Sequence, residues 1–259
     1  MPDPIRLDIH PPFASMILDR PDKRNALSIA MWAAIPALIA LAEDNRDVKV
    51  ILVHGVGGAF AAGADIAEFE TIYATAETAA ASGRTIAAAL NAVEHCPKPV
   101  IAAIEGACVG GGVSLAMATD IRVADDSARF GITPGKLGLV YPAGDTRRLL
   151  ATVGPSAAKD ILFTGRIFGA PEARGYGLVD RLVPTGQALT AAETLGNEIA
   201  AISQWSVRAI KQMIAGLQGG WTEASPEAEA LFVEGFANED FQEGSRAFLE
   251  KRRADFTFS

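Results

Sequence analysis

Cysteine and histidine are scarce in this chain of 259 residues, which has two cysteines and three histidines. The cysteines, Cys96 and Cys108, lie in apolar segments and lack the spacing of metal ligands. A disulfide scaffold and a metal centre built from cysteine and histidine are therefore not expected. We expect two buried thiols, no bound metal and the reducing environment of the cytoplasm.

Excess positive charge and a long apolar run are also missing. The 23 basic residues are outnumbered by 31 acidic ones, which argues against a general surface for nucleic acid or anionic membranes. The N-terminal "MPDPIRLDIHPPF" has no basic start followed by an apolar run, so no secretory signal is expected. The most apolar segment is interrupted by Glu105 and by glycines before it reaches a membrane-spanning length. These features predict a cytoplasmic protein without nucleic-acid or membrane partners.

The sequence alternates between strand patterns and helix patterns. Strands are predicted over 5–9, 13–18, 48–55, 98–106, 121–125 and 128–131. The first two segments flank "HPP" and should be antiparallel. A helix capped by Ser28 is predicted over 29–43, with a kink or a break at Pro36. An Ala-rich helical segment should reach about His95, and beyond Gly154 the pattern is almost wholly helical. This order predicts an α/β core with mostly parallel strands.

The stretch "GACVGGGVSLAMATD", residues 106–120, places three glycines between a buried strand and a helix. Such a turn leaves free N–H groups at the positive end of a helix dipole, where negative charge is favoured. It has neither the G-x-G-x-x-G spacing nor a P-loop lysine. A second glycine turn, "AFAAGADI", follows the preceding buried strand. The two turns can converge on one anion, although close helix packing would also favour glycine.

Four ordered motifs extend over nearly the whole chain: "DRPDKRNALS", "GAFAAGADI", "KPVIAAIEGACVGGG" and "FQEGSRAFLEKRRADF". Together they resemble the crotonase superfamily, the enoyl-CoA hydratase/isomerase family. The resemblance implies a spiral of β-β-α turns over residues 1–195, which carries an acyl-CoA site. It also implies a helical C-terminal trimerisation region over 196–259, and assembly as a homotrimer or a dimer of trimers.

The resemblance further implies which residues form the site. The backbone N–H groups of Ala64 and Gly111 would form an oxyanion hole for the thioester carbonyl of an acyl-CoA. The CoA nucleotide would contact, from this or a neighbouring subunit, Arg24, Ala62, Asp65, Ile66, Phe248 and Lys251. The basic Arg24 and Lys251 suit a phosphate-rich ligand. No cofactor is expected beyond the coenzyme A that is part of the substrate.

Both glutamates that hydratases of this family use to hold and activate water are replaced in this sequence. Ser114 and Pro134 stand at the matching positions, and proline cannot exchange protons, while serine is a poor base without a partner. The aspartate that some dienoyl isomerases and dehalogenases carry one register later is matched by Pro142. With these departures, the resemblance favours a decarboxylase or another lyase that stabilises a thioester enolate.

Tyr141 is the candidate for the proton transfer. It ends the stretch "TPGKLGLVY", which resembles methylmalonyl-CoA decarboxylases, where the matching tyrosine lines the acyl pocket. Tyr141 would donate a proton or orient a carboxylate, while Ser114, Thr133 and Pro134 would shape the pocket wall. A purely packing role for this aromatic ring is the alternative. The neighbouring Asp145 is expected to cap a helix rather than to act as a catalytic acid.

Other readings stay open. The chain could be an enoyl-CoA hydratase or isomerase with a rearranged acid/base pair, or a CoA-thioester binder without activity. "GGVSLA" also resembles a degenerate nucleophile elbow in which Ser114 attacks an ester, but that reaction needs a nearby histidine. Of the remaining carboxylates, Glu68 and Glu70 are expected on a solvated helix face, and Glu105 in a structural hydrogen bond.

Overall fold

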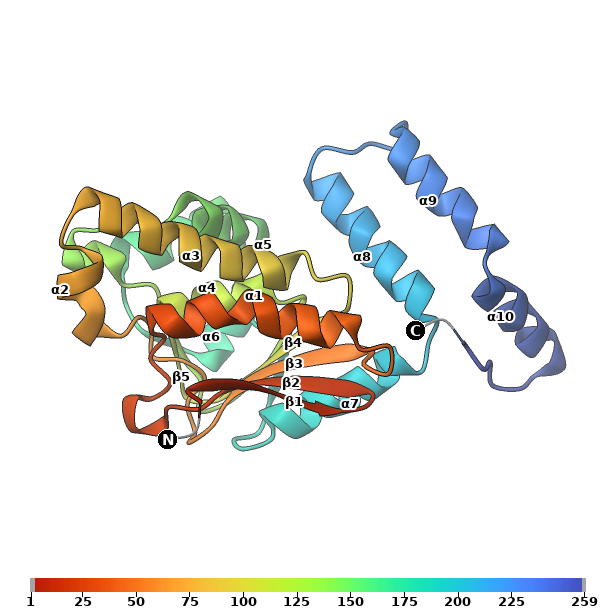
Figure 1. Ribbon diagram of the computed structural model, residues 1–259, viewed down its shortest axis with the longest axis horizontal. Coiled ribbons are helices and arrows are strands. Elements are labelled where there is room, and N and C mark those ends of the chain that lie inside the picture. Colours follow the sequence, from red (N-terminus) through yellow and green to blue (C-terminus); the bar gives the residue numbers. More distant parts are fainter. Residues whose placement is uncertain (1–2, 258–259) are drawn as a thin grey trace.

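A six-stranded sheet forms the centre of the fold in the computed structural model, which describes residues 3–257 (Figure 1). In spatial order its strands are β1 (Ile5–His10), β2 (Phe13–Leu18), β3 (Val50–Gly55), β4 (Val100–Ile104), β6 (Ile121–Asp125) and β9 (Arg181–Val183). β1 and β2 are antiparallel, as predicted, and every following pair is parallel. Parallel neighbours need crossover connections, and helices supply them here.

A second sheet has three short strands. β5 (Ala107–Val109) pairs in parallel with β7 (Arg129–Gly131), which pairs antiparallel with β8 (Phe168–Gly169). Ala61 forms an isolated bridge to Cys108 and so joins the preceding loop to this sheet. The chain thus passes from a strand of the large sheet to the small sheet and then into a helix, and repeats this path. The predicted spiral of β-β-α turns is confirmed.

Helices connect the strands and form the C-terminal part of the chain. The α-helices are α1 (Ile29–Asp44), α2 (Phe69–Ile72), α3 (Ala76–Glu94), α4 (Gly111–Ala118), α5 (Ala143–Thr164), α6 (Ala170–Gly175), α7 (Ala188–Ala200), α8 (Gln204–Gln218), α9 (Pro226–Ala237) and α10 (Glu239–Glu250). The 3-10 helices are η1 (Pro21–Lys23), η2 (Ile66–Glu68) and η3 (Pro134–Leu137). Between residues 3 and 257, no helix is both long enough and apolar enough to cross a membrane.

The central strands of the large sheet, β2, β3 and β4, are buried on both faces, as is usual inside a parallel sheet. Ile51 and Val53 of β3 belong to the main core, which also contains side chains from α1 and α3. Val50 and Leu52, which point the other way, pack with α7. Figure 1 shows the same arrangement, with α1 and α3 on one side of the sheet and α7 on the other. The alternation of two buried faces explains the continuous apolar run of this strand.

The last three helices extend away from the sheets as an arm (Figure 1). Ser203, which caps α8, donates a hydrogen bond of 2.6 Å to the Asp240 carboxylate of α10. The expected boundary between residues 195 and 196 lies inside α7, where Leu195 is buried beside the sheet. The arm therefore begins after α7, at the level of α8.

Ser28 caps α1 as predicted, since its Oγ accepts a hydrogen bond from the Met31 N–H. Of the kink or break expected at Pro36, the break is wrong, because α1 continues through the proline to Asp44. Ile35 and Ile39 are buried on either side of the proline, which holds both halves against the core. The Ala-rich helical segment reaches Glu94, close to the expected end at His95, and it consists of η2, α2 and α3. A capping box at Thr75 starts α3 anew.

The region beyond Gly154 is also less helical than expected. Residues 181–183 form β9, which pairs in parallel with β6 and completes the large sheet. This strand has three residues and only half-buried apolar side chains, so its sequence carries no clear strand pattern. The short β8 is likewise embedded in a segment that the sequence does not distinguish from its helical surroundings. Both strands are specified by their neighbours in the sheets.

Candidate active site

The two glycine turns converge, as predicted. The Ala61 N–H donates to the Ala107 carbonyl at 2.8 Å, and the Val109 N–H donates to the Ala61 carbonyl at 3.0 Å. The loop around Ala61 therefore runs along β5 and reaches the start of α4. A side chain at Gly112 would overlap the Ala61 carbonyl oxygen, so glycine is required for this approach.

Two main-chain donors come together at this junction. A Cβ placed on Gly111 would lie 4.0 Å from the Ala64 nitrogen. Leu27 forms a bridge beside Ala64, in which the Leu27 N–H donates to the Gly63 carbonyl and the Asp65 N–H donates to the Leu27 carbonyl. This pattern leaves the Ala64 N–H outside the bridge, and Gly111 is the first residue of α4. Across the described residues, neither N–H donates to a protein acceptor.

A buried cluster of polar side chains lies one helical turn beyond Gly111. The Ser114 Oγ is 2.7 Å from the Tyr141 Oη and 3.0 Å from the Asp145 Oδ2. All three residues are less than 8% exposed, at 2%, 7% and 4% respectively. Because residues three apart lie on one helix face, Ser114 projects on the same side as Gly111. The structure thus joins the two sequence-predicted residues Ser114 and Tyr141 through a direct hydrogen bond.

Asp145 does not cap a helix, contrary to expectation. α5 begins at Ala143, its N-cap is Pro142, and no side chain caps it. Asp145 is instead in the first turn and accepts hydrogen bonds from Ser114 and from the Arg148 Nη1, at 3.3 Å. Arg148 also donates to Glu94 of α3 at 2.6 Å. The spacing of Asp145 and Arg148, three residues apart on one helix, was the available sequence signal for this pair.

Burial dominates the electrostatics of this cluster. It raises the pKa of Asp145 above its usual range, although hydrogen bonds from Ser114 and Arg148 oppose the shift. Burial, reinforced by the neighbouring Asp145 charge, also raises the pKa of Tyr141. Glu94 differs, because hydrogen bonds from Arg147 and Arg148 outweigh the effect of burial and lower its pKa. Glu94 is therefore ionised, whereas Tyr141 keeps its proton and Asp145 is biased toward its neutral form.

Three of the residues expected along the CoA nucleotide, Arg24, Ala62 and Asp65, lie in neighbouring loops. The Ala62 N–H donates to the Arg24 carbonyl at 2.9 Å, and the Arg24 side chain is exposed. Asp65 is buried, and its carboxylate accepts from Arg20 at 2.8 Å and from Lys23 at 3.3 Å. The Arg20 hydrogen bond is the main cause of its lowered pKa. The Asp65 carboxylate thus orders the basic loop before α1.

The other expected contact residues lie in two places, Ile66 after the second glycine turn and Thr133 and Pro134 in the loop that contains Tyr141. Ile66 follows Asp65 and has an exposed side chain. Thr133 and Pro134 are half-buried at the start of η3, the short helix of the segment that ends at Tyr141. This segment between β7 and α5 places them in the same loop as Tyr141. The structure records no hydrogen bond between their side chains and the polar cluster within residues 3–257.

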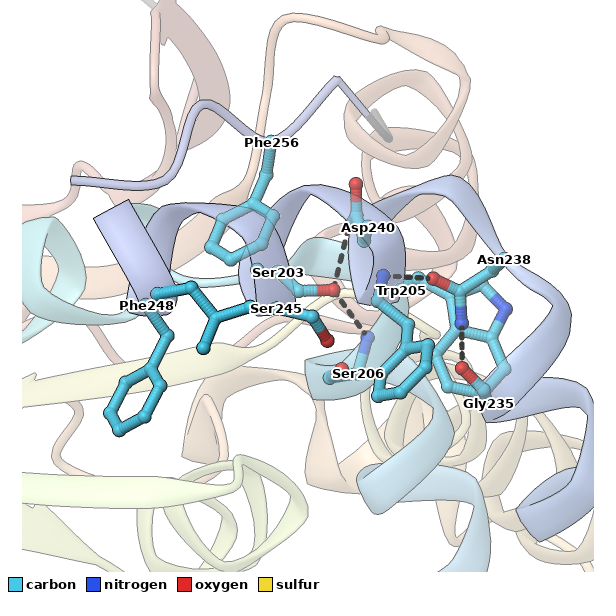
Figure 2. A pocket seen from close by; sticks show the side chains of 12 residues that line it. Ser203, Trp205, Ser206, Gly235, Asn238, Asp240, Ser245, Phe248 and Phe256 are labelled. Carbon is cyan, nitrogen blue, oxygen red and sulfur yellow. Dashed lines mark hydrogen bonds between the residues drawn. The ribbon is translucent and has the colours of Figure 1, made fainter. Parts of the chain in front are cut away.

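Phe248 and Lys251 are not brought to this site by their own chain. α10 and the loop before α2 lie at opposite ends of the molecule's long axis (Figure 1). Phe248 lines a separate hollow of about 600 Å³ between α8, α9 and α10, together with Trp205 and Phe256 (Figure 2). The Phe248 side chain is 82% exposed. Among the described residues of one chain, Phe248 and Lys251 therefore do not reach the expected CoA site.

The structure also bears on two other expectations, the nucleophile elbow at Ser114 and the solvated position of Glu68. Ser114 has no histidine among its hydrogen-bond partners in the described chain, which are Gly110, Tyr141 and Asp145, so the nucleophile elbow lacks its base. Glu68 is not simply solvated, because its carboxylate accepts a hydrogen bond of 2.8 Å from the Ile29 N–H. That bond ties the loop after Ala64 to the start of α1 and supports the convergence of the two turns.

The spiral of β-β-α turns is the fold of the crotonase superfamily. Residues 10–258 match the family model described as enoyl-CoA hydratase/isomerase. The chain therefore belongs to the enoyl-CoA hydratase/isomerase family, as its four motifs predict. A crotonyl-CoA hydratase from Syntrophomonas wolfei subsp. wolfei is 36% identical over 247 residues, and the match covers 94% of each protein.

Solved structures agree with this assignment. A protein assigned to the enoyl-CoA hydratase/isomerase family from Hyphomonas neptunium is 69% identical, with a TM-score of 0.98 over 99% of this chain and 98% of that one. An enoyl-CoA hydratase from Bacillus anthracis is 31% identical, with a TM-score of 0.93 over 99% of this chain and 100% of that one. The fold is thus shared along the full length of both proteins.

The requirement for glycine at position 112 can be tested by substitution. We expect Gly112→Ala to lower the free energy of unfolding by about 1–3 kcal/mol, because the added methyl group overlaps the Ala61 carbonyl. Urea unfolding at a fixed protein concentration measures the change. Gly83→Ala in α3 is the matched control, since a Cβ there meets no atom within 4 Å. It should raise the stability by about 0.5–1 kcal/mol. Equal effects of both substitutions would contradict the close approach.

Proposed function

We propose that the chain binds an acyl-CoA thioester with its carbonyl oxygen between the N–H groups of Ala64 and Gly111. The observation that carries this proposal is the pair of adjacent main-chain donors without protein acceptors. The carbonyl oxygen becomes negative when an enolate forms next to it. Two donors already in position stabilise that charge without reorganisation, each by about 3–4 kcal/mol in comparable sites. The N-terminus of α4 adds a favourable field.

For the reaction, we propose hydration or isomerisation of an enoyl-CoA with a rearranged acid/base arrangement. The names of similar proteins, a crotonyl-CoA hydratase and an enoyl-CoA hydratase, support this choice. Tyr141 and Ser114, joined by a hydrogen bond of 2.7 Å, are the groups proposed to carry the proton. Their buried hydroxyls lie one helical turn from Gly111, where a substrate carbon next to the carbonyl would be. They replace a glutamate pair that this sequence lacks.

Decarboxylation of a small malonyl-type CoA thioester is the second candidate. It is favoured by Ser114 and Pro134 at the positions of the hydratase glutamates, because loss of CO₂ needs an oxyanion hole but no base. The same Tyr141 hydroxyl would protonate the resulting enolate. The names of the relatives favour hydration over this reaction.

The CoA moiety and the assembly complete the proposal. Arg24, exposed beside Ala62, is proposed to contact the phosphates, and Lys251 and Phe248 to reach them from a neighbouring subunit. This requires an oligomer, and we propose a homotrimer or a dimer of trimers. Large apolar side chains exposed on α8 to α10 support such an assembly, among them Ile210, Ile214, Phe232, Phe236, Phe248 and Leu249.

Removal of one main-chain donor tests the carbonyl site. Gly111→Pro lacks the N–H but fits the first position of a helix, whereas Gly111→Ala keeps the N–H and carries the same Cβ. We expect the proline variant to turn over acyl-CoA about 10²–10³-fold more slowly than the alanine variant. Steady-state kinetics and calorimetry with acetyl-CoA provide the comparison. Equal turnover in the two variants would remove Gly111 from the proposed site.

A mass-spectrometric screen identifies the reaction. Wild type is incubated with crotonyl-, malonyl-, methylmalonyl- and ethylmalonyl-CoA, and we expect 3-hydroxybutyryl-CoA from crotonyl-CoA. Tyr141→Phe should slow the reaction by about 10²-fold through loss of the proton carrier. Tyr176→Phe, which removes a tyrosine hydroxyl bonded to Arg166, Asp160 and Glu172 and not to Ser114, should have no effect. CO₂ release without hydroxyacyl product would instead establish the decarboxylase, and no turnover of any thioester would favour a binding protein.

The assembly is measured by light scattering at micromolar concentration. We expect the mass of three or six chains of 27.1 kDa, because the exposed apolar side chains of the arm need a partner. A stable monomer would overturn both the trimer and the contribution of Lys251 from another subunit.

A further inference from the structure

Asp145 is a buried carboxylate in direct contact with the proposed proton carriers. It is 4% exposed, its Oδ2 is 3.0 Å from the Ser114 Oγ, and it does not cap the helix on which it lies. Burial of a carboxylate opposes folding unless partners compensate it. Its partners are the buried Arg148 guanidinium, at 3.3 Å, and Ser114, which is itself joined to Tyr141. The carboxylate therefore ends a hydrogen-bonded chain that runs from Tyr141 through Ser114 to Asp145.

The hydrogen atoms of this cluster can be arranged in two ways. Ser114 has one hydroxyl proton, so of its two side-chain partners, Tyr141 and Asp145, it donates to only one at a time. When Asp145 is ionised it can only accept, so Ser114 donates to Asp145 and Tyr141 donates to Ser114. When Asp145 is protonated, it donates to Ser114, Ser114 donates to Tyr141, and the Tyr141 proton becomes available to a bound molecule. The same oxygen positions fit both arrangements.

The surrounding charges allow both states of Asp145. Arg148 is 3.3 Å from its Oδ1 and favours the ionised form. Burial and the ionised Glu94, which is held by Arg148 and Arg147, favour the neutral form. On the other side, the fully buried Cys108 is a neutral thiol near Tyr141, because burial raises its pKa. The balance of these groups lets Asp145 change its protonation state without an unpaired buried charge.

We propose that Asp145 is the source of the proton transferred at this site and takes it up in the reverse direction, and that it acts through Ser114 and Tyr141. The proposal rests on the proposed function, since the final acceptor is the α-carbon of a thioester enolate. The Asp145 O–H bond breaks as its proton passes to Ser114, the Ser114 proton passes to Tyr141, and the Tyr141 proton forms the new C–H bond. The negative charge of the enolate ends on the Asp145 carboxylate, beside Arg148. The reverse sequence removes an α-proton, and no further reactant is needed.

Exchange of α-protons for deuterium in butyryl-CoA tests the relay without assuming hydration or decarboxylation. We expect Asp145→Asn to slow the exchange by about 10²-fold or more, while the Kd for butyryl-CoA from calorimetry stays within about threefold of wild type. Ser114→Ala should slow the exchange by a similar factor. The double variant should be no slower than either single variant, because the residues act as one unit.

Asp160→Asn is the matched control. Asp160 lies in the same element, α5, beyond the non-helical Gly154, and its carboxylate accepts hydrogen bonds from Arg166 and Tyr176, but its side chain is 41% exposed. The Asp160→Asn variant should exchange the α-protons of butyryl-CoA at the wild-type rate. Wild-type exchange in Asp145→Asn with intact binding would overturn the relay and leave the proposed function standing. Absence of butyryl-CoA binding in wild type would overturn the proposed function and the relay together.

Infrared difference spectroscopy gives a readout that needs no substrate. In wild type, the C=O band of protonated Asp145 should disappear as the pH rises above the usual range of aspartate, and Tyr141 ring bands should change at the same pH. In Ser114→Ala, the Asp145 band should still titrate while the Tyr141 bands stay constant. If the Tyr141 bands of wild type stay constant while the Asp145 band titrates, the two groups are not coupled through Ser114 and the relay is wrong.

Discussion

The close approach of the Ala61 carbonyl to Gly112 is the constraint on which the rest of the site depends. It lets the loop between β3 and η2 run along β5, with hydrogen bonds to Ala107 and Val109. Only then do the nitrogens of Ala64 and Gly111 become neighbours. The bridge from Leu27 and the hydrogen bond from the Ile29 N–H to the Glu68 carboxylate hold the other side of this loop. Packing and main-chain hydrogen bonds, not a particular side chain, set the geometry.

The fold and the main-chain part of the site could be predicted from the sequence because both depend on local patterns. Glycine turns after buried strands indicate free N–H groups, and four motifs in order indicate the family. β9 could not be predicted, since it depends on a partner strand distant in the sequence, and local propensity does not report such contacts. The start of α3 at Thr75 is a local capping box, but the Ala-rich composition around it favours helix on both sides and hides the boundary.

Asp145 shows the same limitation at the level of chemistry. Near the start of a helix, an aspartate is usually a cap, and that expectation is wrong here because Pro142 takes the N-cap position. The residue instead turns inward to Ser114, which is 31 positions away in the sequence. Ser114, at a position where the family resemblance implies a glutamate, is hydrogen-bonded to both Tyr141 and Asp145. The carboxylate of this site therefore comes from α5 and not from α4.

Because the two donors are main-chain groups, they are retained with the fold, whereas the side chains that would carry protons can change. Substitution of side chains cannot delete an N–H group, except by proline, so a lineage that keeps the loop along β5 keeps both donors. The residues that would move protons belong to α4, to the loop after β7 and to α5, and they can vary independently of that loop. New chemistry can thus evolve by changing a few side chains while an unaltered backbone goes on presenting the same two N–H groups.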